Sequence, residues 1–384
     1  MENAVKLAGG QSLRLRLILA ALSGRAVRIS DIRSSDEAPG LRDYEASLLR
    51  LVDKMSNGVK IAINETGTML RFVPGELLGG DITHDCPSSR SVVYFLEFAA
   101  ALAPFCKTPL RLRLRGITHD NQDHSIDSFK TITIAVINRL IGSSFSTEQA
   151  PLSVEVERRG VYPSGVGSVL FVSPIIPKGI APINMTGEDG KVKRVRGVAW
   201  TSKVSTQFSA AVIDAARSVL NPCLSDVWIY TDALKGAECE GYGLSLVSET
   251  DKQVLKGSSA CRGAEEDARS LGIEVAQQLL NEIDIGGLVD SSNEWLVCLF
   301  MALSEDFKIS RFSFGCTLAP YTMECMRLIR EFLGIKFKIN AKAADELVTL
   351  NEGEETPEAI TVRNETFTLE CIGANIINSA RRTF

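Results

Sequence analysis

Histidine, the usual proton-transfer residue near neutral pH, is scarce in this chain. Only three occur, His84, His119 and His124. Any mechanism in the C-terminal half must therefore work without an imidazole from that half. His119, Asp120 and Asp123 share one short segment and could bind a metal or move a proton, although a hydrogen-bonded loop is the simpler interpretation.

Two glycine-bearing turns stand beside basic or aromatic residues. Residues 9–14 read Gly-Gly-Gln-Ser-Leu-Arg and open a predicted helix, whose free N–H groups and dipole favour an anion such as phosphate. Residues 158–167 form the second turn. No Walker lysine loop, Gly-x-Gly-x-x-Gly motif or Gly-x-Ser-x-Gly elbow accompanies them, so a plain tight turn remains the simpler interpretation of the first.

Arginines are spaced to share faces at two places. Arg111, Arg113 and Arg115 alternate along a predicted strand and point to one side, which suits either an RNA- or anion-binding face or a solvated one. Arg327 and Arg330 share a face of a predicted helix whose apolar stripe lies elsewhere. That ridge could dock an acidic partner peptide, with a solvated face as the alternative.

Composition bounds the class of protein. The 384 residues are 45% hydrophobic and 23% charged, with a net charge of −5, which disfavours coating nucleic acid through bulk positive charge. The nine cysteines show no Cys-x-x-Cys spacing, which predicts reduced core thiols and disfavours zinc. The densest apolar run, 295–303, is too short to span a membrane, and no secretory signal is visible.

One pattern of predicted elements occurs three times, although generic α/β patterns can also resemble one another by chance. A helix opened by a small polar residue is followed by an alternating strand, a second helix and closing strands. Wider spacing between the second and third repeats predicts an inserted α/β domain. The predicted first helices are 10–22, 88–102 and 291–303, and the predicted second helices are 44–55, 126–141 and 321–333. The repeats span about 1–80, 81–182 and 284–384, so the repeat domain comprises 1–182 and 284–384 and the insert is 183–283. An acidic loop is predicted at 351–357.

Three motifs, in order, resemble those of RNA 3'-terminal phosphate cyclases. They are residues 9–14, Ile32-Arg33 with Pro39-Gly40-Leu41, and Arg159-Gly160-x-Tyr162-Pro163-x-Gly165. The resemblance covers essentially the whole chain. It implies an α/β fold of three tandem repeats, each with two helices and a four-stranded sheet like the C-terminal domain of translation initiation factor three, plus an inserted thioredoxin-like domain.

The resemblance also implies which catalytic groups are missing. Cyclases attack ATP with a histidine and pass AMP to an RNA 3'-phosphate. That histidine would precede the helix 321–333, but residues 315–321 read Gly-Cys-Thr-Leu-Ala-Pro-Tyr. An Asp-Gln pair of the cyclases falls at about Trp295-Leu296, and a glutamate falls at Leu7. We therefore expect no cyclase activity and no cofactor.

Segments 116–123 and 318–322 are similar to the eukaryotic cyclase-like branch, which acts in maturation of the small (40S) ribosomal subunit. The resemblance implies a nucleolar factor for early pre-rRNA processing toward 18S rRNA, a monomer before assembly and without membrane association. Its implied partners are a large nucleolar GTPase of the small-subunit processome, the box C/D guide snoRNP and pre-rRNA. Residues 191–196 are the nearest candidate for an import signal. We expect retained anion or RNA contacts at Gln11, Arg14, Arg33, Arg42, Arg159, Tyr162 and Gly165, and partner contacts at Arg327 and Arg330.

Two rival functions remain open. The first is an endoribonuclease that cleaves pre-rRNA through His119, Asp120 and Asp123, or through the Arg327–Arg330 ridge. The second is an active ATP-dependent cyclase with an unusual nucleophile such as Cys316 or Tyr321.

Overall fold

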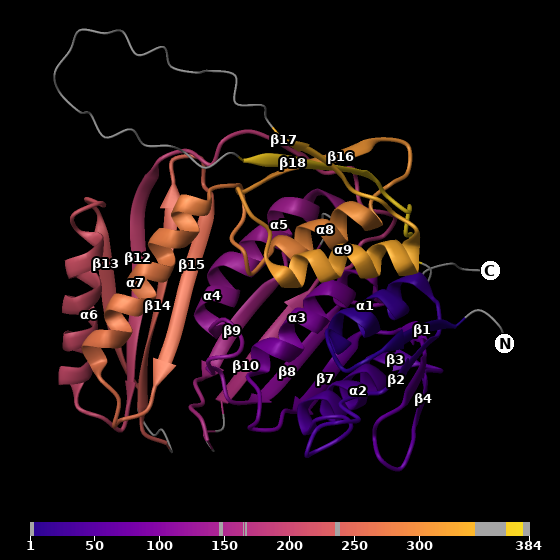
Figure 1. The fold of residues 1–384 in the computed structure, drawn as a ribbon, viewed down its shortest axis with the longest axis horizontal. Coiled ribbons are helices and arrows are strands. Elements are labelled where there is room, and N and C mark those ends of the chain that lie inside the picture. Colours follow the sequence, from indigo (N-terminus) through magenta and orange to yellow (C-terminus); the bar gives the residue numbers. More distant parts are fainter. Residues whose placement is uncertain are drawn as a thin grey trace, which may run out of the picture.

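Three small sheets and the helices packed between them form the larger part of the protein, and a fourth sheet with two helices lies to one side (Figure 1). The computed structural model describes residues 4–145, 149–163, 165, 167–234, 239–341 and 366–378. The α/β fold class predicted from the sequence is confirmed. The predicted acidic loop at 351–357 lies outside the described residues.

The three repeats share one strand topology. In each, the first two strands are parallel, the last two are antiparallel, and the final strand sits between its predecessors. The first repeat comprises β1 (Val5–Ala8), α1 (Leu13–Ser23), β2 (Val27–Ser30), α2 (Asp43–Met55), β4 (Lys60–Ile63) and β5 (Leu70–Val73). The second comprises β7 (Gly80–Asp85), α3 (Val92–Leu102), β8 (Leu110–Gly116), a helical run of α4 (Ile126–Ser128), η2 (Phe129–Thr133) and α5 (Ile134–Ile141), and then β9 (Ser153–Arg158) and β10 (Gly167–Ser173). The third comprises β11 (Asn184–Met185), α8 (Glu294–Leu303), β16 (Ile309–Phe314), α9 (Pro320–Leu333), β17 (Lys338–Ala341) and β18 (Phe367–Ile372).

The insert interrupts the third repeat between its first strand and its first helix. Its sheet has the order β13-β12-β14-β15, and both of its helices pack on one face. The elements are β12 (Val192–Ser202), α6 (Thr206–Leu220), β13 (Val227–Leu234), β14 (Gly241–Thr250), β15 (Leu255–Arg262) and α7 (Ala268–Ile285). The structure differs from the predicted boundary at 183, because β11 already pairs with β16 of the third repeat.

The first helices of the repeats are the centre of one shared core. Every residue of α3 and α8 is buried, because α1, α3, α8 and α9 cover one another (Figure 1). The apolar run at 295–303 is therefore a core helix. Within the described ranges, we find no helix with the length and apolar character that a membrane span requires. Five of the cysteines are buried, and burial raises the pKa of the Cys106 thiol to about 12.

Candidate functional site

Arg14 is the centre of a buried cluster that joins all three repeats. It lies in the first turn of α1 and is only 7% exposed. Its guanidinium forms an ion pair with Glu97 of α3, and its Nε and Nη2 donate to the Tyr321 hydroxyl at 3.2 and 3.1 Å. The ring centroids of Tyr94, Trp295 and Tyr321 lie 4.7, 5.8 and 5.5 Å from its Cζ. The arginine predicted to bind an anion is thus already paired and enclosed.

Charge is balanced within this Arg14 cluster. Burial acts to lower the pKa of Arg14, but opposing charges, led by Glu97, outweigh it and the net shift is upward. Burial also raises the pKa of Glu97, against the attraction of Arg14. A buried ion pair of this kind holds its two helices in register, since removing either partner leaves an uncompensated charge.

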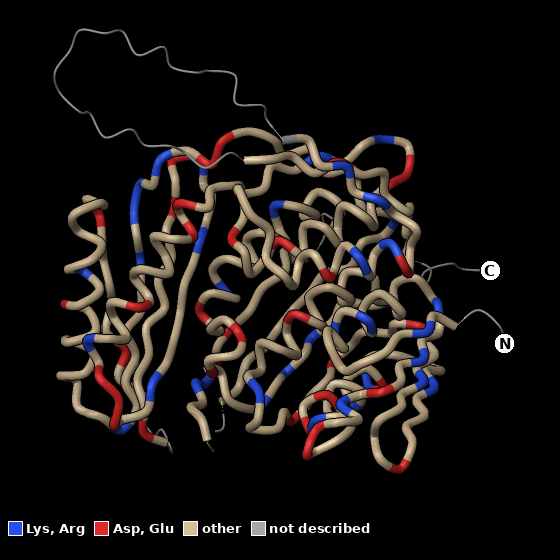
Figure 2. Tube along the Cα trace, in the orientation of Figure 1, with Lys and Arg blue, Asp and Glu red and all other residues tan. Residues whose placement is uncertain are grey.

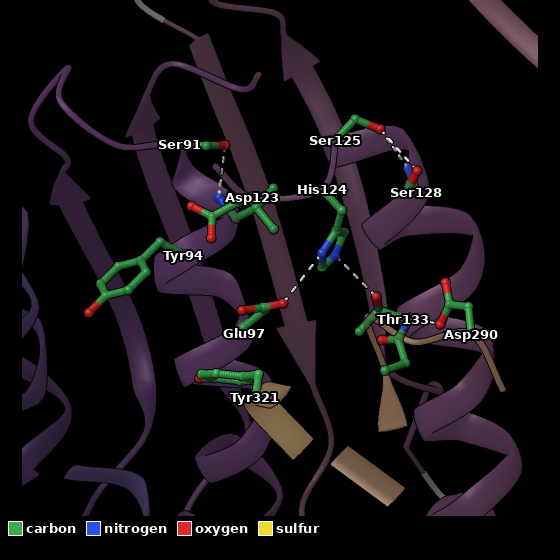
Figure 3. A network of polar contacts seen from close by, with 12 residues as sticks. Ser91, Tyr94, Glu97, Asp123, His124, Ser125, Ser128, Thr133, Asp290 and Tyr321 are labelled. Carbon is green, nitrogen blue, oxygen red and sulfur yellow. Dashed lines mark hydrogen bonds and ion pairs between the residues drawn. The ribbon is translucent and has the colours of Figure 1, made fainter. Parts of the chain in front are cut away.

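A line of polar side chains leads from Glu97 through His124 to the buried Thr133 (Figure 3). His124 Nδ1 lies 3.4 Å from Glu97 Oε1, and its Nε2 lies 3.4 Å from the Thr133 hydroxyl. The ring also stacks on Phe129, with 5.9 Å between centroids. Burial lowers the pKa of His124 to about 4, so the imidazole is neutral at physiological pH.

His124 also lines a cleft of about 470 Å³ where the second repeat, the insert and the start of the third repeat meet. Asp290 forms part of the wall of this cleft. Burial raises the pKa of Asp290 to about 7, and its carboxylate accepts a 2.7 Å hydrogen bond from Asn293. Among the described residues that line the cleft, Arg262 is the one arginine or lysine, and it already pairs with Glu274. This acidic wall does not suit an RNA backbone.

Arg33 and Arg42 flank the start of α2 rather than joining the Arg14 cluster. Arg33 makes a two-pronged pair with Glu45 at 2.7 and 2.8 Å, and Arg42 pairs with Asp36 at 3.2 Å. A side chain on Gly10 would press on the Arg33 guanidinium, at 3.1 Å from its Nη1. The predicted Gln11 is exposed beside this turn.

Arg159 joins the second repeat to the insert. Its Nη1 and Nη2 donate to Asp127 at 2.6 and 2.7 Å, and its Nε donates to Asp232 of β13 at 3.1 Å. The same turn brings backbone segments close together, since a Cβ on Gly165 would lie 2.5 Å from the Val161 nitrogen. Tyr162 is 61% exposed beside it. Arg14, Arg33 and Arg159 thus lie in separate clusters, each with its own carboxylate, and anion binding by the set stays a prediction.

The groups considered for RNA cleavage have structural partners. Asp123 pairs with Arg90 at 2.6 Å, and Asp120 accepts a 2.8 Å hydrogen bond from the Ser91 backbone nitrogen. His119 packs on Trp200, 4.8 Å between centroids. Among the described residues, no three His, Cys, Asp or Glu side chains are grouped to hold a metal.

The two predicted basic surfaces differ in their pairing. On β8, Arg111, Arg113 and Arg115 do share one face, and each lies beside an acidic side chain, respectively Asp81, Glu157 and Asp85. On α9, Arg327 is exposed, with Glu324 at 3.5 Å, and Arg330 is also exposed. The apolar side of α9 buries Cys325, Leu328, Ile329 and Phe332, close to the predicted stripe.

The N-terminus of α9 is the place where the resemblance puts a cyclase nucleophile. Pro320 begins the helix, and the Glu294 carboxylate accepts a 2.9 Å hydrogen bond from the Ala319 nitrogen just before it. Burial raises the pKa of Glu294 to about 7. A helix N-terminus attracts anions, and here a side chain of the protein already occupies that position. Tyr321, in the first turn, faces Arg14 rather than solvent.

Comparison with known proteins identifies the group to which this chain belongs. The family described as RNA 3'-terminal phosphate cyclase matches residues 5–339. The mouse RNA 3'-terminal phosphate cyclase-like protein is 41% identical over 352 residues, covering 90% of this chain and 92% of its own. The chain belongs to the RNA 3'-terminal phosphate cyclase family. A probable cyclase-like protein of Dictyostelium discoideum is 39% identical and covers 99% of this chain and all of its own. The rRNA processing protein Rcl1 of fission yeast is 37% identical, covering 78% of this chain and 81% of its own.

Three residues in the Arg14 cluster and at the N-terminus of α9 have roles that the sequence analysis missed. Glu97, Tyr94 and Glu294 were not predicted, although Glu97 carries the one charge in the apolar helix α3 and Glu294 opens the apolar helix α8. A charged residue inside an otherwise apolar helix requires a buried partner, and that requirement was the available signal.

Proposed function

We propose that this protein is an rRNA-processing factor that acts in maturation of the small ribosomal subunit and has no RNA cyclase activity. The observation that carries the second half is the closed N-terminus of α9. No histidine lies in residues 315–321, Glu294 takes the anion position, and Tyr321 is drawn toward Arg14. The processing role is supported by the fission yeast relative, which is named an rRNA processing protein.

The finer parts of the proposal extend from the family resemblance. We propose a nucleolar location, action before release of 18S rRNA, and assembly with a large GTPase, the box C/D guide snoRNP and pre-rRNA. The exposed Arg327–Arg330 ridge of α9 is the proposed partner contact, because an acidic segment can pair with both guanidinium groups without displacing a strong internal salt bridge.

Depletion of the protein from its own cells tests the processing role. We expect the precursors of 18S rRNA to accumulate on hybridisation blots, while the large-subunit rRNAs mature normally. Re-expression of the wild-type chain should restore 18S rRNA. Unchanged 18S maturation after full depletion would contradict the proposal.

A second measurement tests the loss of cyclase activity. Purified protein incubated with α-labelled ATP and magnesium should carry no AMP, with a true cyclase as the positive control. Label bound to the protein and lost in Cys316→Ala or Tyr321→Phe would contradict the proposal. The same protein should leave a pre-rRNA transcript intact, since His119, Asp120 and Asp123 are held by structural contacts.

A further inference from the structure

One face of the inserted sheet carries two exposed aromatic rings. Trp228 and Tyr230 lie two residues apart on β13, so both point to the same side, and they are 54% and 56% exposed. Ile229, between them, is buried with the residues of α6 and α7. The two rings therefore lie on the sheet face that the helices leave open, on a strand at the edge of the sheet (Figure 1).

Another part of the same face is covered by the second repeat. Trp200 packs on His119, and the Ser245 hydroxyl lies 2.8 Å from that of Ser125 in the loop before α4. Asp232, two residues beyond Tyr230, pairs with Arg159. The covered part thus includes β14 and the C-terminal ends of β12 and β13. Trp228 and Tyr230 lie outside it, beyond the contact with the second repeat.

Basic side chains line the neighbouring strand. In the register of β12 and β13, Arg196 lies beside Trp228. Arg196 is held by Asp226 through two hydrogen bonds of 2.8 Å, and Arg194 is held by Glu249 at 2.8 Å, yet both guanidinium groups remain partly exposed. Lys191, just before the strand, and Lys193, near its start, are also exposed. In Figure 2, blue segments that mark Lys and Arg lie along the part of the tube labelled β12 in Figure 1.

Rings and cations in this arrangement are suited to unpaired nucleotides. The two ring centroids are 6.1 Å apart and the planes are inclined at 59°, so the rings are not stacked on each other. Exposed aromatic rings on an open sheet face stack on unpaired bases, and neighbouring arginines contact the backbone. A duplex hides its bases and cannot stack in this way. An apolar protein partner would leave the guanidinium groups of Arg194 and Arg196 without new acceptors.

We propose that the open face of β12 and β13 binds single-stranded RNA through Trp228, Tyr230, Arg194 and Arg196. The segment 191–196, considered above as an import signal, takes its place here as the backbone contact. The choice of RNA over other single strands rests on the proposed function in rRNA processing. In this assignment the insert supplies a nucleic-acid contact well away from the closed N-terminus of α9.

The tryptophans of the chain provide a direct readout. Of the three, Trp200 and Trp295 are buried and Trp228 is exposed. Titration of the full-length protein with an unstructured 12-nucleotide RNA of mixed A and U should therefore quench the Trp228 component of the emission. A hairpin RNA of the same length of strand should quench it much less.

Variants are compared by the anisotropy of the same RNA carrying a fluorescent label. Trp228→Ala with Tyr230→Ala should weaken binding by about tenfold or more, because each base-ring stack contributes substantially. Trp228→Phe should retain most of the affinity. Phe307→Ala, which removes an aromatic side chain that is 65% exposed in the third repeat, serves as the matched control and should bind like the wild type. Melting curves should coincide for all four proteins.

Three results would overturn the proposed RNA site on β12 and β13. They are no binding of the 12-nucleotide RNA by the wild type at low salt, equal binding by the double alanine variant, and binding of a protein segment instead of RNA by these rings. If the RNA site fails while depletion still blocks 18S maturation, the proposed function stands; if RNA binds as expected while 18S matures without the protein, the proposed function fails alone.

Discussion

The Arg14 cluster and the open face of the insert both combine aromatic rings with arginines, but the first encloses its arginine and the second leaves its side chains exposed. In the cluster, aromatic rings enclose one arginine against Glu97. Arg14, Glu97, Tyr94 and Trp295 are buried between repeats, and Tyr321 is partly buried. On the insert, Trp228 and Tyr230 stand exposed beside arginines that are held in place but still accessible. Since the arginines of both regions are paired with carboxylates, burial rather than residue type separates an arginine that holds the fold together from one that is available to a ligand.

The comparison also explains why retained family motifs are ambiguous. Arg14 and Arg159 lie in segments that resemble cyclase motifs, yet in this chain each is paired with a buried or half-buried carboxylate. Arg194 and Arg196 belong to none of those motifs. A ligand reaching Arg14 would have to displace Glu97 and Tyr321, whereas the guanidinium groups of Arg194 and Arg196 stay partly exposed beside the carboxylates that hold them.

The largest expected effect on stability is at the Arg14 cluster. Arg14→Met should lower the free energy of unfolding by about 3–5 kcal/mol, because Glu97 would remain buried without a counter-charge. Denaturant titration measures the change. The double variant Arg14→Met/Glu97→Gln should be more stable than Arg14→Met alone, since it removes the unpaired charge. Wild-type stability in the single variant would show that the cluster is not a structural joint.

A smaller loss is expected where the insert meets the second repeat. Arg159→Ala removes the arginine that pairs with both Asp127 and Asp232, and Asp127 keeps only its contact with His119 among these groups. We expect a loss of about 1–3 kcal/mol in the free energy of unfolding, with faster proteolysis where the insert meets the second repeat. Arg113→Ala is the matched control, because its pair with Glu157 is exposed to solvent and should contribute little to stability. Equal losses of stability from the two changes would contradict the distinction between buried and exposed arginine–carboxylate pairs.

Asp290 tests what happens to a buried carboxylate that lacks an arginine. Its folded pKa is about 7, above the ordinary value near 3.9, so folding takes up a proton and the wild type loses stability as pH rises between these values. Asp290→Asn cannot titrate but can still accept from Asn293. Its melting temperature relative to the wild type should therefore rise from pH 5 to pH 8, by the equivalent of about 2 kcal/mol.

The buried histidines do not obscure this measurement. His124 and His84 both have a pKa lowered by burial to about 4, and they titrate equally in the wild type and the variant. Their contribution cancels in the difference between the two melting curves. A difference that stays constant across the pH range would mean that Asp290 titrates in the folded protein as it does in water.

The smallest effect on stability is expected on the exposed ridge of α9. Arg327→Glu with Arg330→Glu should change the free energy of unfolding by less than about 1 kcal/mol, since neither side chain is buried. The same change should abolish capture of the proposed GTPase partner. Unaltered capture would refute the ridge as a docking site.

Local pattern was enough to predict most helices and several strands. The predicted helix 88–102 contains α3, because its capping Ser91 and its apolar run are both local signals. The opening strands β1, β7 and β11 were missed. β7 contains a single aliphatic residue, Ile82, and β11 has two residues in all, so their pairing is decided by neighbouring strands rather than by their own sequence.

The sites were less predictable than the fold for a related reason. The turn at 9–14 indicated an anion site at Arg14, but this arginine is contacted by residues of α3, α8 and α9. Such a cluster depends on contacts between repeats, which no local spacing encodes. Trp228 and Tyr230 do alternate along a strand, but only the packing of the second repeat shows that their part of the face is left open.

The position of the insert has a consequence for how the chain folds. β11 pairs Asn184 with Arg311, and the whole insert lies between these partners. Closing so long a loop costs conformational entropy, and the cost falls if the insert has already folded and brought its two ends together. We therefore expect the insert to fold first during synthesis and to hold its two ends close together. β11 would then pair with β16 in the third sheet only after α7 has formed.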